Sequence, residues 1–95
     1  RLSLQPARFF GFTDRGLLWP GLAADIVVFD PKTVRPGRPE RAHDYPAGQW
    51  RWIQPAEGVS HTIVNGEILV EDGRLTEARA GRVLRNARAR RAVPA

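Results

Sequence analysis

Two histidines, His43 and His61, are the side chains of this 95-residue sequence best suited to bind a metal or move a proton. A catalytic zinc ion usually has three protein ligands, so a site shared by both histidines needs a third ligand such as Glu57. His61 falls on an apolar face of an expected hairpin, beside Val70, where a packed structural histidine is the favoured interpretation. His43 and the adjacent Asp44 lie in a proline-rich stretch that predicts a loop. We therefore predict no metal-binding residue in the chain.

Five carboxylates stand where strands and turns are expected to begin or end. Carboxylates at such positions usually hydrogen-bond the local backbone. No two of them have a spacing that identifies a general acid and a general base, so we predict no catalytic and no cofactor-binding residue. The five are Asp25, Asp30, Asp44, Glu57 and Asp72.

The triplet Trp50-Arg51-Trp52 could stack nucleic-acid bases or cover a substrate. Large aromatic side chains more often supply buried area. The alternation of the two tryptophans therefore favours packing onto a sheet, or onto a part of a longer protein that is absent here.

The formal net charge of +5 comes from one end of the chain. Every acidic residue lies at or before Glu77, and six arginines follow within residues 79–91. This tail could bind polyanions, and Arg82, Arg85 and Arg88 would form a stripe if it were helical. A solvated, flexible end is the favoured interpretation, so nucleic acid is not an expected partner.

The strongest structural signal is a β-hairpin around Asn65-Gly66, because both residues accept the positive φ of a type I′ turn. A two-residue loop fixes the register, so that Thr62 faces Leu69. One residue further from the turn, His61 faces Val70. The alternation predicts a buried core face and a second, mixed face. The core face would contain Val59, His61, Ile63, Ile68 and Val70.

Three further elements are expected before the hairpin. Residues 3–10 predict a short helix with Ser3 as its N-cap and Gly11 as its left-handed end. Pro20-Gly21 suits a type II turn. Residues 25–30 predict a strand that is apolar on both faces and therefore covered on both sides.

Residues 31–58 contain five prolines and three glycines. This density predicts a loop with at most one short strand, around residues 49–53. A structureless stretch of this length is uncommon in a compact domain. We therefore expect it to wrap over something outside the chain.

These elements predict a mainly β fold, a partial β-sandwich with a short N-terminal helix. Residues 1–13 form the helical link, residues 14–78 form the β segment with the hairpin at 59–72, and residues 79–95 form a basic, flexible tail.

The sequence contains no methionine and no cysteine. Without an initiator methionine or the features of a signal peptide, the chain is expected to be a segment of a longer protein. The absence of cysteine excludes disulfides and thiolate sites and favours a cytoplasmic origin. The longest apolar run, residues 26–29, is far shorter than the roughly 20 residues that cross a bilayer, so no membrane partner is expected.

Six short segments follow one another in a characteristic order. They are GLLWPG (16–21), ADIVVFDP (24–31), DYPAG (44–48), GVSHTIVNG (58–66), DGRLT (72–76) and GRVLR (81–85). Their order resembles the C-terminal end of the amidohydrolase superfamily, most closely the D-aminoacylase (N-acyl-D-amino-acid deacylase) branch. Residues 49–54 and the arginines beyond Arg85 lie outside the pattern.

The resemblance implies a (β/α)8 barrel with one or two metal ions, usually zinc, that activate water to attack an amide or related C–N bond. It also implies a small β-sandwich beside the barrel, to which this chain would contribute the C-terminal strands. A barrel alone needs about 250 residues, so the family's metal ligands map to no position here. The expected partners are the missing barrel and the N-terminal sandwich strands, and zinc is expected only in that barrel.

Three functions are therefore open. A non-catalytic segment of a metal-dependent amidohydrolase predicts a bare apolar surface and possible self-association through exposed edge strands. An independent β-rich binding module predicts a closed monomer with its own pocket. A polyanion binder predicts salt-sensitive binding that is lost with residues 79–95.

Overall fold

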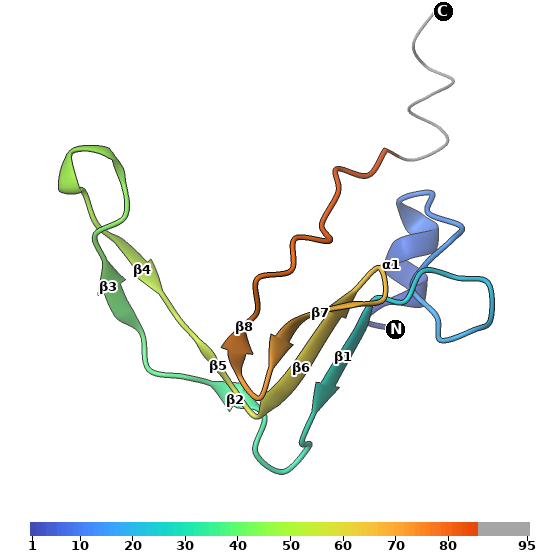
Figure 1. The fold of residues 1–95 in the computed structure, drawn as a ribbon, viewed down its shortest axis with the longest axis horizontal. Helices are drawn as coiled ribbons and strands as arrows, with labels where there is room; N and C mark the ends of the chain where they lie inside the picture. The colour runs from blue at the N-terminus through green and yellow to red at the C-terminus, as the bar shows by residue number, and fades with distance from the viewer. Residues whose placement is uncertain (86–95) are drawn as a thin grey trace, which may run out of the picture.

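A computed structural model describes residues 1–85 of the chain, and this part is mainly β with one short helix, as predicted. It contains several antiparallel sheets (Figure 1). The elements are α1 (Leu4–Phe9), β1 (Ile26–Phe29), β2 (Arg35–Pro36), β3 (Glu40–Ala42), the 3-10 turn η1 (Pro46–Gly48), β4 (Arg51–Ile53), β5 (Ala56–Glu57), β6 (Val59–Val64), β7 (Glu67–Glu71) and β8 (Arg74–Leu75).

The main sheet has four antiparallel strands in the order β1-β6-β7-β8. Its central hairpin joins β6 to β7 through Asn65 and Gly66, whose φ angles of 49° and 79° confirm the predicted turn. Asp72 and Gly73, at 49° and 76°, turn the chain again into β8. Both turns follow from residues that tolerate a left-handed backbone.

The predicted register of the hairpin is correct near the turn and wrong beyond it. Ile63 lies opposite Ile68, but the next residue, Thr62, lies opposite Val70. Leu69 is therefore an extra residue in β7, a β-bulge. The bulge shifts the pairing, so that His61 faces Glu71 and not Val70. The predicted five-residue core face is broken at this point.

No hydrophobic side chain is buried within residues 1–85. The predicted covering of both faces of β1 is therefore wrong for this part of the chain. Val27, Val28 and Phe29 are 55%, 45% and 53% exposed. Since adjacent residues of a strand point to opposite faces, the sheet presents apolar side chains to solvent on both sides.

Helix α1 ends as predicted and begins differently. Gly11 has a φ of 83°, and the amide of Phe12 donates to the carbonyl of Ala7 at 2.8 Å. Ser3 occupies the N-cap position, but its hydroxyl makes no capping hydrogen bond. The turn at Pro20-Gly21 is also present, with Gly21 at a φ of 89° and the amide of Leu22 donating to the carbonyl of Trp19.

The loop predicted for residues 31–58 is the clearest error in the fold. Four short strands form there, with β2 pairing β5 and β3 pairing β4, all antiparallel. We call residues 35–57 the arm. A hydrogen bond of 3.0 Å from the Gln54 amide to the carbonyl of Gly37 joins its two sides between the strand pairs.

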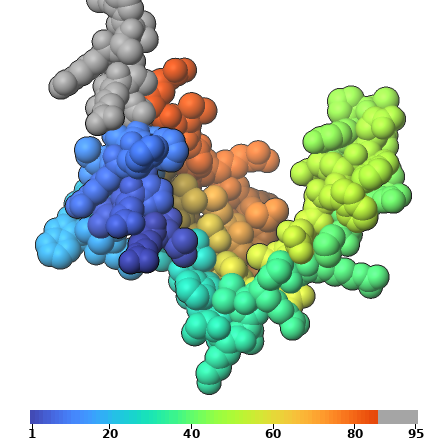
Figure 2. Space-filling view, turned by 180° about the vertical axis from the view of Figure 1, so that it is seen from behind, coloured from blue at the N-terminus to red at the C-terminus, as the bar shows by residue number. Residues whose placement is uncertain are grey.

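The arm projects away from the main sheet as a separate lobe, on the opposite side from α1 (Figures 1 and 2). The Cα radius of gyration is 16.8 Å, against about 12–13 Å for a compact domain of this length. Within residues 1–85, no helix is long and apolar enough to cross a membrane.

Candidate functional site

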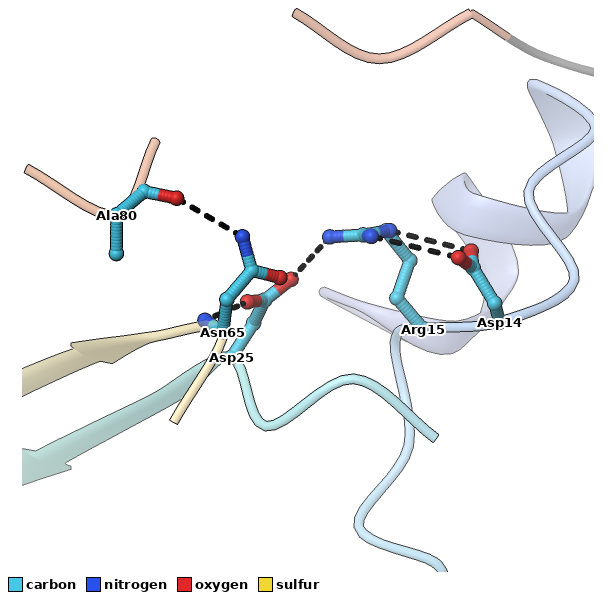
Figure 3. A network of polar contacts seen from close by, with 5 residues as sticks. All are labelled: Asp14, Arg15, Asp25, Asn65 and Ala80. Atoms are coloured by element: carbon cyan, nitrogen blue, oxygen red, sulfur yellow. Dashed lines mark hydrogen bonds and ion pairs between the residues drawn. The ribbon is translucent and has the colours of Figure 1, made fainter. Parts of the chain in front are cut away.

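Asp25 lies at the centre of a polar network that joins distant parts of the chain (Figure 3). It lies just before β1, and one carboxylate oxygen accepts a 2.9 Å hydrogen bond from the backbone amide of Asn65. Its other oxygen accepts a 2.5 Å bond from the Arg15 guanidinium. The side-chain amide of Asn65 donates to the carbonyl of Ala80 at 2.9 Å. The network thus joins the loop after α1, the start of β1, the hairpin turn and the segment after β8.

The polar groups of this network bind one another, which leaves them poorly placed to bind a substrate. Arg15 also binds Asp14, and the hydrogen bond from its guanidinium holds the pKa of the Asp14 carboxyl below its usual value. The Arg15 side chain is 15% exposed, against 32% for Asp25. Both oxygens of the Asp25 carboxylate are taken up by these bonds, so the arrangement supports a structural role. We call Arg15, Asp25 and Asn65 the clamp.

An open hollow of about 540 Å³ lies beside the clamp, between α1 and the start of β1. Apolar groups dominate its lining, and its two charged side chains are Arg15 and Asp25. Because Arg15 and Asp25 pair with each other, the hollow could hold an apolar group but has no unpaired charged side chain in its lining.

The arm carries a compact group of aromatic and cationic side chains. Arg41 lies directly opposite Trp52 in the pairing of β3 with β4. Its guanidinium carbon is 4.4 Å from the ring centroid of Trp50 and 5.3 Å from that of Trp52. The two indoles meet edge to face with centroids 5.7 Å apart. We call Arg41, Trp50 and Trp52 the aromatic face of the arm.

The opposite side of the arm carries an ion pair. Arg51 pairs with Ala42 across the strands, and its guanidinium holds the carboxylate of Asp44 through bonds of 2.7, 2.8 and 3.0 Å. This hydrogen bonding lowers the pKa of the Asp44 carboxyl. The Arg51 guanidinium also lies 5.9 Å from the ring centroid of Tyr45.

The predicted packing of the two tryptophans onto a sheet is not seen within the described residues. Trp50 is 43% exposed and Trp52 is 59% exposed. They contact each other and Arg41, and they remain open to solvent on their outer side.

The structure does not gather the histidines and Glu57 into a site. His61 is half-buried on β6, with Nδ1 3.0 Å from the hydroxyl of Ser60, and His43 is exposed on the arm. Residues 1–85 hold no group of three His, Asp or Glu side chains that could bind a metal ion. The zinc that the resemblance implies therefore has no suitable donor set among these residues.

The prediction that the carboxylates bond local backbone holds for Asp30, whose side chain accepts from the amide of Lys32 at 2.8 Å. It is wrong for Asp25, which bonds a residue 40 positions away, and for Asp44 and Glu57, which pair with Arg51 and Arg35. No sequence pattern predicts these pairs, because each one forms only when the fold brings separate segments of the chain together.

The arginine tail falls only partly within the described residues. Residues 81–85 have no assigned helix or strand, and Arg82 and Arg85 are exposed. Arg88 and the other arginines of residues 86–95 lie outside the described residues, so the predicted stripe and flexible end stay predictions.

The curated proteins that are similar to most of this chain include a hydantoinase and a deacylase. D-phenylhydantoinase of Escherichia coli O127:H6 is 34% identical over 86 residues, which cover 87% of the chain and 19% of that protein. N-acyl-D-glutamate deacylase of Alcaligenes xylosoxydans xylosoxydans is 36% identical over 88 residues, which cover 90% of the chain and 15% of that protein. No protein-family model and no solved structure matches the chain.

The chain therefore spans less than a fifth of the length of either relative. Because a hydantoinase and a deacylase both match it, the comparisons support the conclusion that the chain is a segment of an amidohydrolase-family protein.

Proposed function

We propose that this chain is a non-catalytic, C-terminal β segment of a metal-dependent amidohydrolase. In the intact protein it completes a small β-sandwich and packs against the catalytic barrel. The observation that carries this proposal is a four-stranded sheet with exposed apolar side chains on both faces and no buried hydrophobic side chain in residues 1–85. Such a sheet is one layer of a domain, and a second layer from outside these residues must pack on it to form a hydrophobic core.

Complete burial of a Val or Phe side chain contributes about 1.5–3 kcal/mol. Val27, Val28 and Phe29 each keep about half of their surface in water. Covering them would therefore add about 1 kcal/mol per residue, from the same transfer free energy. This gain is available only when a second layer packs on the sheet.

The proposed reaction of the intact enzyme is hydrolysis of a non-peptide C–N bond, with an N-acyl-D-amino acid as substrate. The name of one relative gives a member of this class, N-acyl-D-glutamate, and the name of the other gives the alternative, a phenylhydantoin. In the proposal, zinc in the barrel activates the water, and no residue of this chain takes part in the chemistry. We expect the intact enzyme to be cytoplasmic.

The test is a substrate panel assayed on the intact protein and on the 95-residue chain side by side, with added zinc. The panel contains N-acetyl-D-amino acids, N-acetyl-D-glutamate and D-phenylhydantoin. We expect hydrolysis by the intact protein alone. Hydrolysis by the chain unaided would contradict the non-catalytic role, and an inactive intact protein would contradict the proposed reaction class.

Two other functions have weaker support. An independent binding module should enclose its own core, yet the described residues bury no hydrophobic side chain. Polyanion binding would depend on arginines of which half lie beyond Arg85. We expect the isolated chain, without the rest of the enzyme, to self-associate through β1 and β8, the edge strands of the main sheet.

A further inference from the structure

We propose that the aromatic face of the arm docks on the part of the intact amidohydrolase that lies outside these 95 residues. The partner surface is apolar and carries an aspartate or glutamate that pairs with Arg41. This inference rests on the proposed function and adds to it a defined contact between the arm and the rest of the enzyme.

The register of the arm places its aromatic side chains together. Arg41 and Trp52 are direct cross-strand partners, so they project from the same side of the ribbon. Trp50 lies two residues before Trp52 and shares that side because side chains alternate along a strand. Arg51, between the two tryptophans, projects from the other side, where it binds Asp44. The ribbon thus carries the two tryptophans and Arg41 on one side, and the Arg51–Asp44 ion pair with Ala42 and Ile53 on the other.

The aromatic face needs a covering surface. A two-stranded ribbon is marginally stable in water unless a further layer packs on it. The arm projects away from the main sheet, and both tryptophans keep about half of their surface exposed (Figure 1). A tryptophan can bury about 150–250 Å² in all, so the exposed halves of the pair together offer roughly that area to a partner. Tryptophan is also enriched among the residues that contribute most of the binding energy of interfaces.

The charges on the arm point to a carboxylate on the partner surface. Within residues 1–85, Arg35 and Arg51 of the arm are each paired with a carboxylate, whereas Arg38 and Arg41 have no ion pair. Of these two unpaired arginines, Arg41 is the one that lies against the tryptophans. An arginine that becomes covered on docking must be paired to avoid a large desolvation cost. The tryptophans already hold its guanidinium in place, so the partner needs to supply only the anion.

The length of the relatives favours the rest of the enzyme as the occupant. The chain corresponds to 19% of one relative and 15% of the other. On the proposed function, most of the intact protein therefore lies outside these residues and is joined to them covalently. Such a tethered surface has a high effective concentration, which gives it an advantage over a second copy of the chain.

The test is site-specific photo-crosslinking in the intact protein. The photoreactive aromatic residue p-benzoylphenylalanine replaces Trp52 in one variant and Arg51, on the opposite side of the ribbon, in the matched control. After irradiation, mass spectrometry of the digested monomer should find position 52 joined to a residue outside the 95-residue segment, several-fold more often than position 51. Crosslinks from position 52 to a second copy, to nucleic acid, or at the level of the control would overturn the proposal.

A second measurement tests the role of the charge. Arg41→Gln in the intact protein should lower the thermal midpoint, whereas Arg38→Gln, at an exposed arm residue outside the aromatic face, should leave it unchanged. Equal effects of the two variants would overturn the pairing of Arg41. The substrate panel on the wild-type protein distinguishes failure of the docking from failure of the proposed function. An active enzyme without the crosslink refutes only the docking. A crosslinked but inactive protein refutes only the proposed function.

Discussion

Phe29 gives the sharpest test of whether the exposed sheet is covered in the intact protein. It lies on β1 opposite Val59 and is 53% exposed in the described chain. Replacing a fully buried Phe by Ala costs about 3–5 kcal/mol. With half of the side chain already in water, the same truncation should cost about half as much, roughly 1.5–2.5 kcal/mol. The difference between these ranges reports whether another layer covers β1.

The assay is native-state hydrogen exchange of the β6 amides in the intact protein, measured for wild type and Phe29→Ala. Exchange reports the local free energy of opening of this sheet, so it does not require the whole enzyme to unfold in one step. We expect a loss of about 3–5 kcal/mol. Phe29→Leu should retain most of the stability, and Glu67→Ala, at an exposed position on β7, should change it by less than about 0.5 kcal/mol. A loss of about 2.5 kcal/mol or less in Phe29→Ala would match the half-exposed estimate and refute the second layer.

Further predictions concern the clamp, a constrained glycine and the arm. Asp25→Ala removes acceptors for the Arg15 guanidinium and for a backbone amide, and should cost about 1–3 kcal/mol by the same exchange assay, with Asp25→Asn intermediate. Gly58→Ala should cost at least about 2 kcal/mol, because φ is +78° and the new Cβ would lie 2.6 Å from backbone atoms; retained exchange protection would contradict this. The lowered pKa of Asp44 means that its ion pair with Arg51 stabilises the arm above the ordinary aspartate pKa of about 3.9 and is lost as pH falls through the lowered value. In an NMR titration, Arg51→Gln should raise the titration midpoint of the Asp44 carboxyl. An unchanged midpoint would show that Arg51 does not lower the pKa of Asp44.

Local chemistry allowed several elements to be predicted. Asn65-Gly66 and Pro20-Gly21 contain residues that accept positive φ, and the turns form at those positions. The apolar run of β1 likewise becomes a strand, and Gly11 ends the helix. These outcomes depend on one or a few neighbouring residues, which the sequence presents directly.

Pairing between distant segments was not predictable in the same way. Ile68, Leu69 and Val70 are three consecutive apolar residues that satisfy either register, so nothing local signals the bulge at Leu69. The arm was interpreted as a loop because prolines weaken strands. Its strands are two or three residues long, and Pro36 lies at a strand end, where a proline is tolerated.

The candidate sites show the same limit. The interpretation of His61 as structural stays a prediction, and the clamp between Arg15, Asp25 and Asn65 has no signal in the sequence. Its partners are 10 and 40 residues apart, and only the fold brings them together. The sequence shows the aromatic triplet at residues 50–52, but only the pairing of β3 with β4 brings its cationic partner Arg41 to it.

The most direct test of the central claim is hydroxyl-radical footprinting of β1 in the isolated chain and in the intact protein. We expect Val27, Val28 and Phe29, on both faces of the strand, to be oxidised readily in the chain and protected in the intact protein. Equal oxidation in the two forms would contradict this expectation, because the apolar sheet would then have no covering layer to complete.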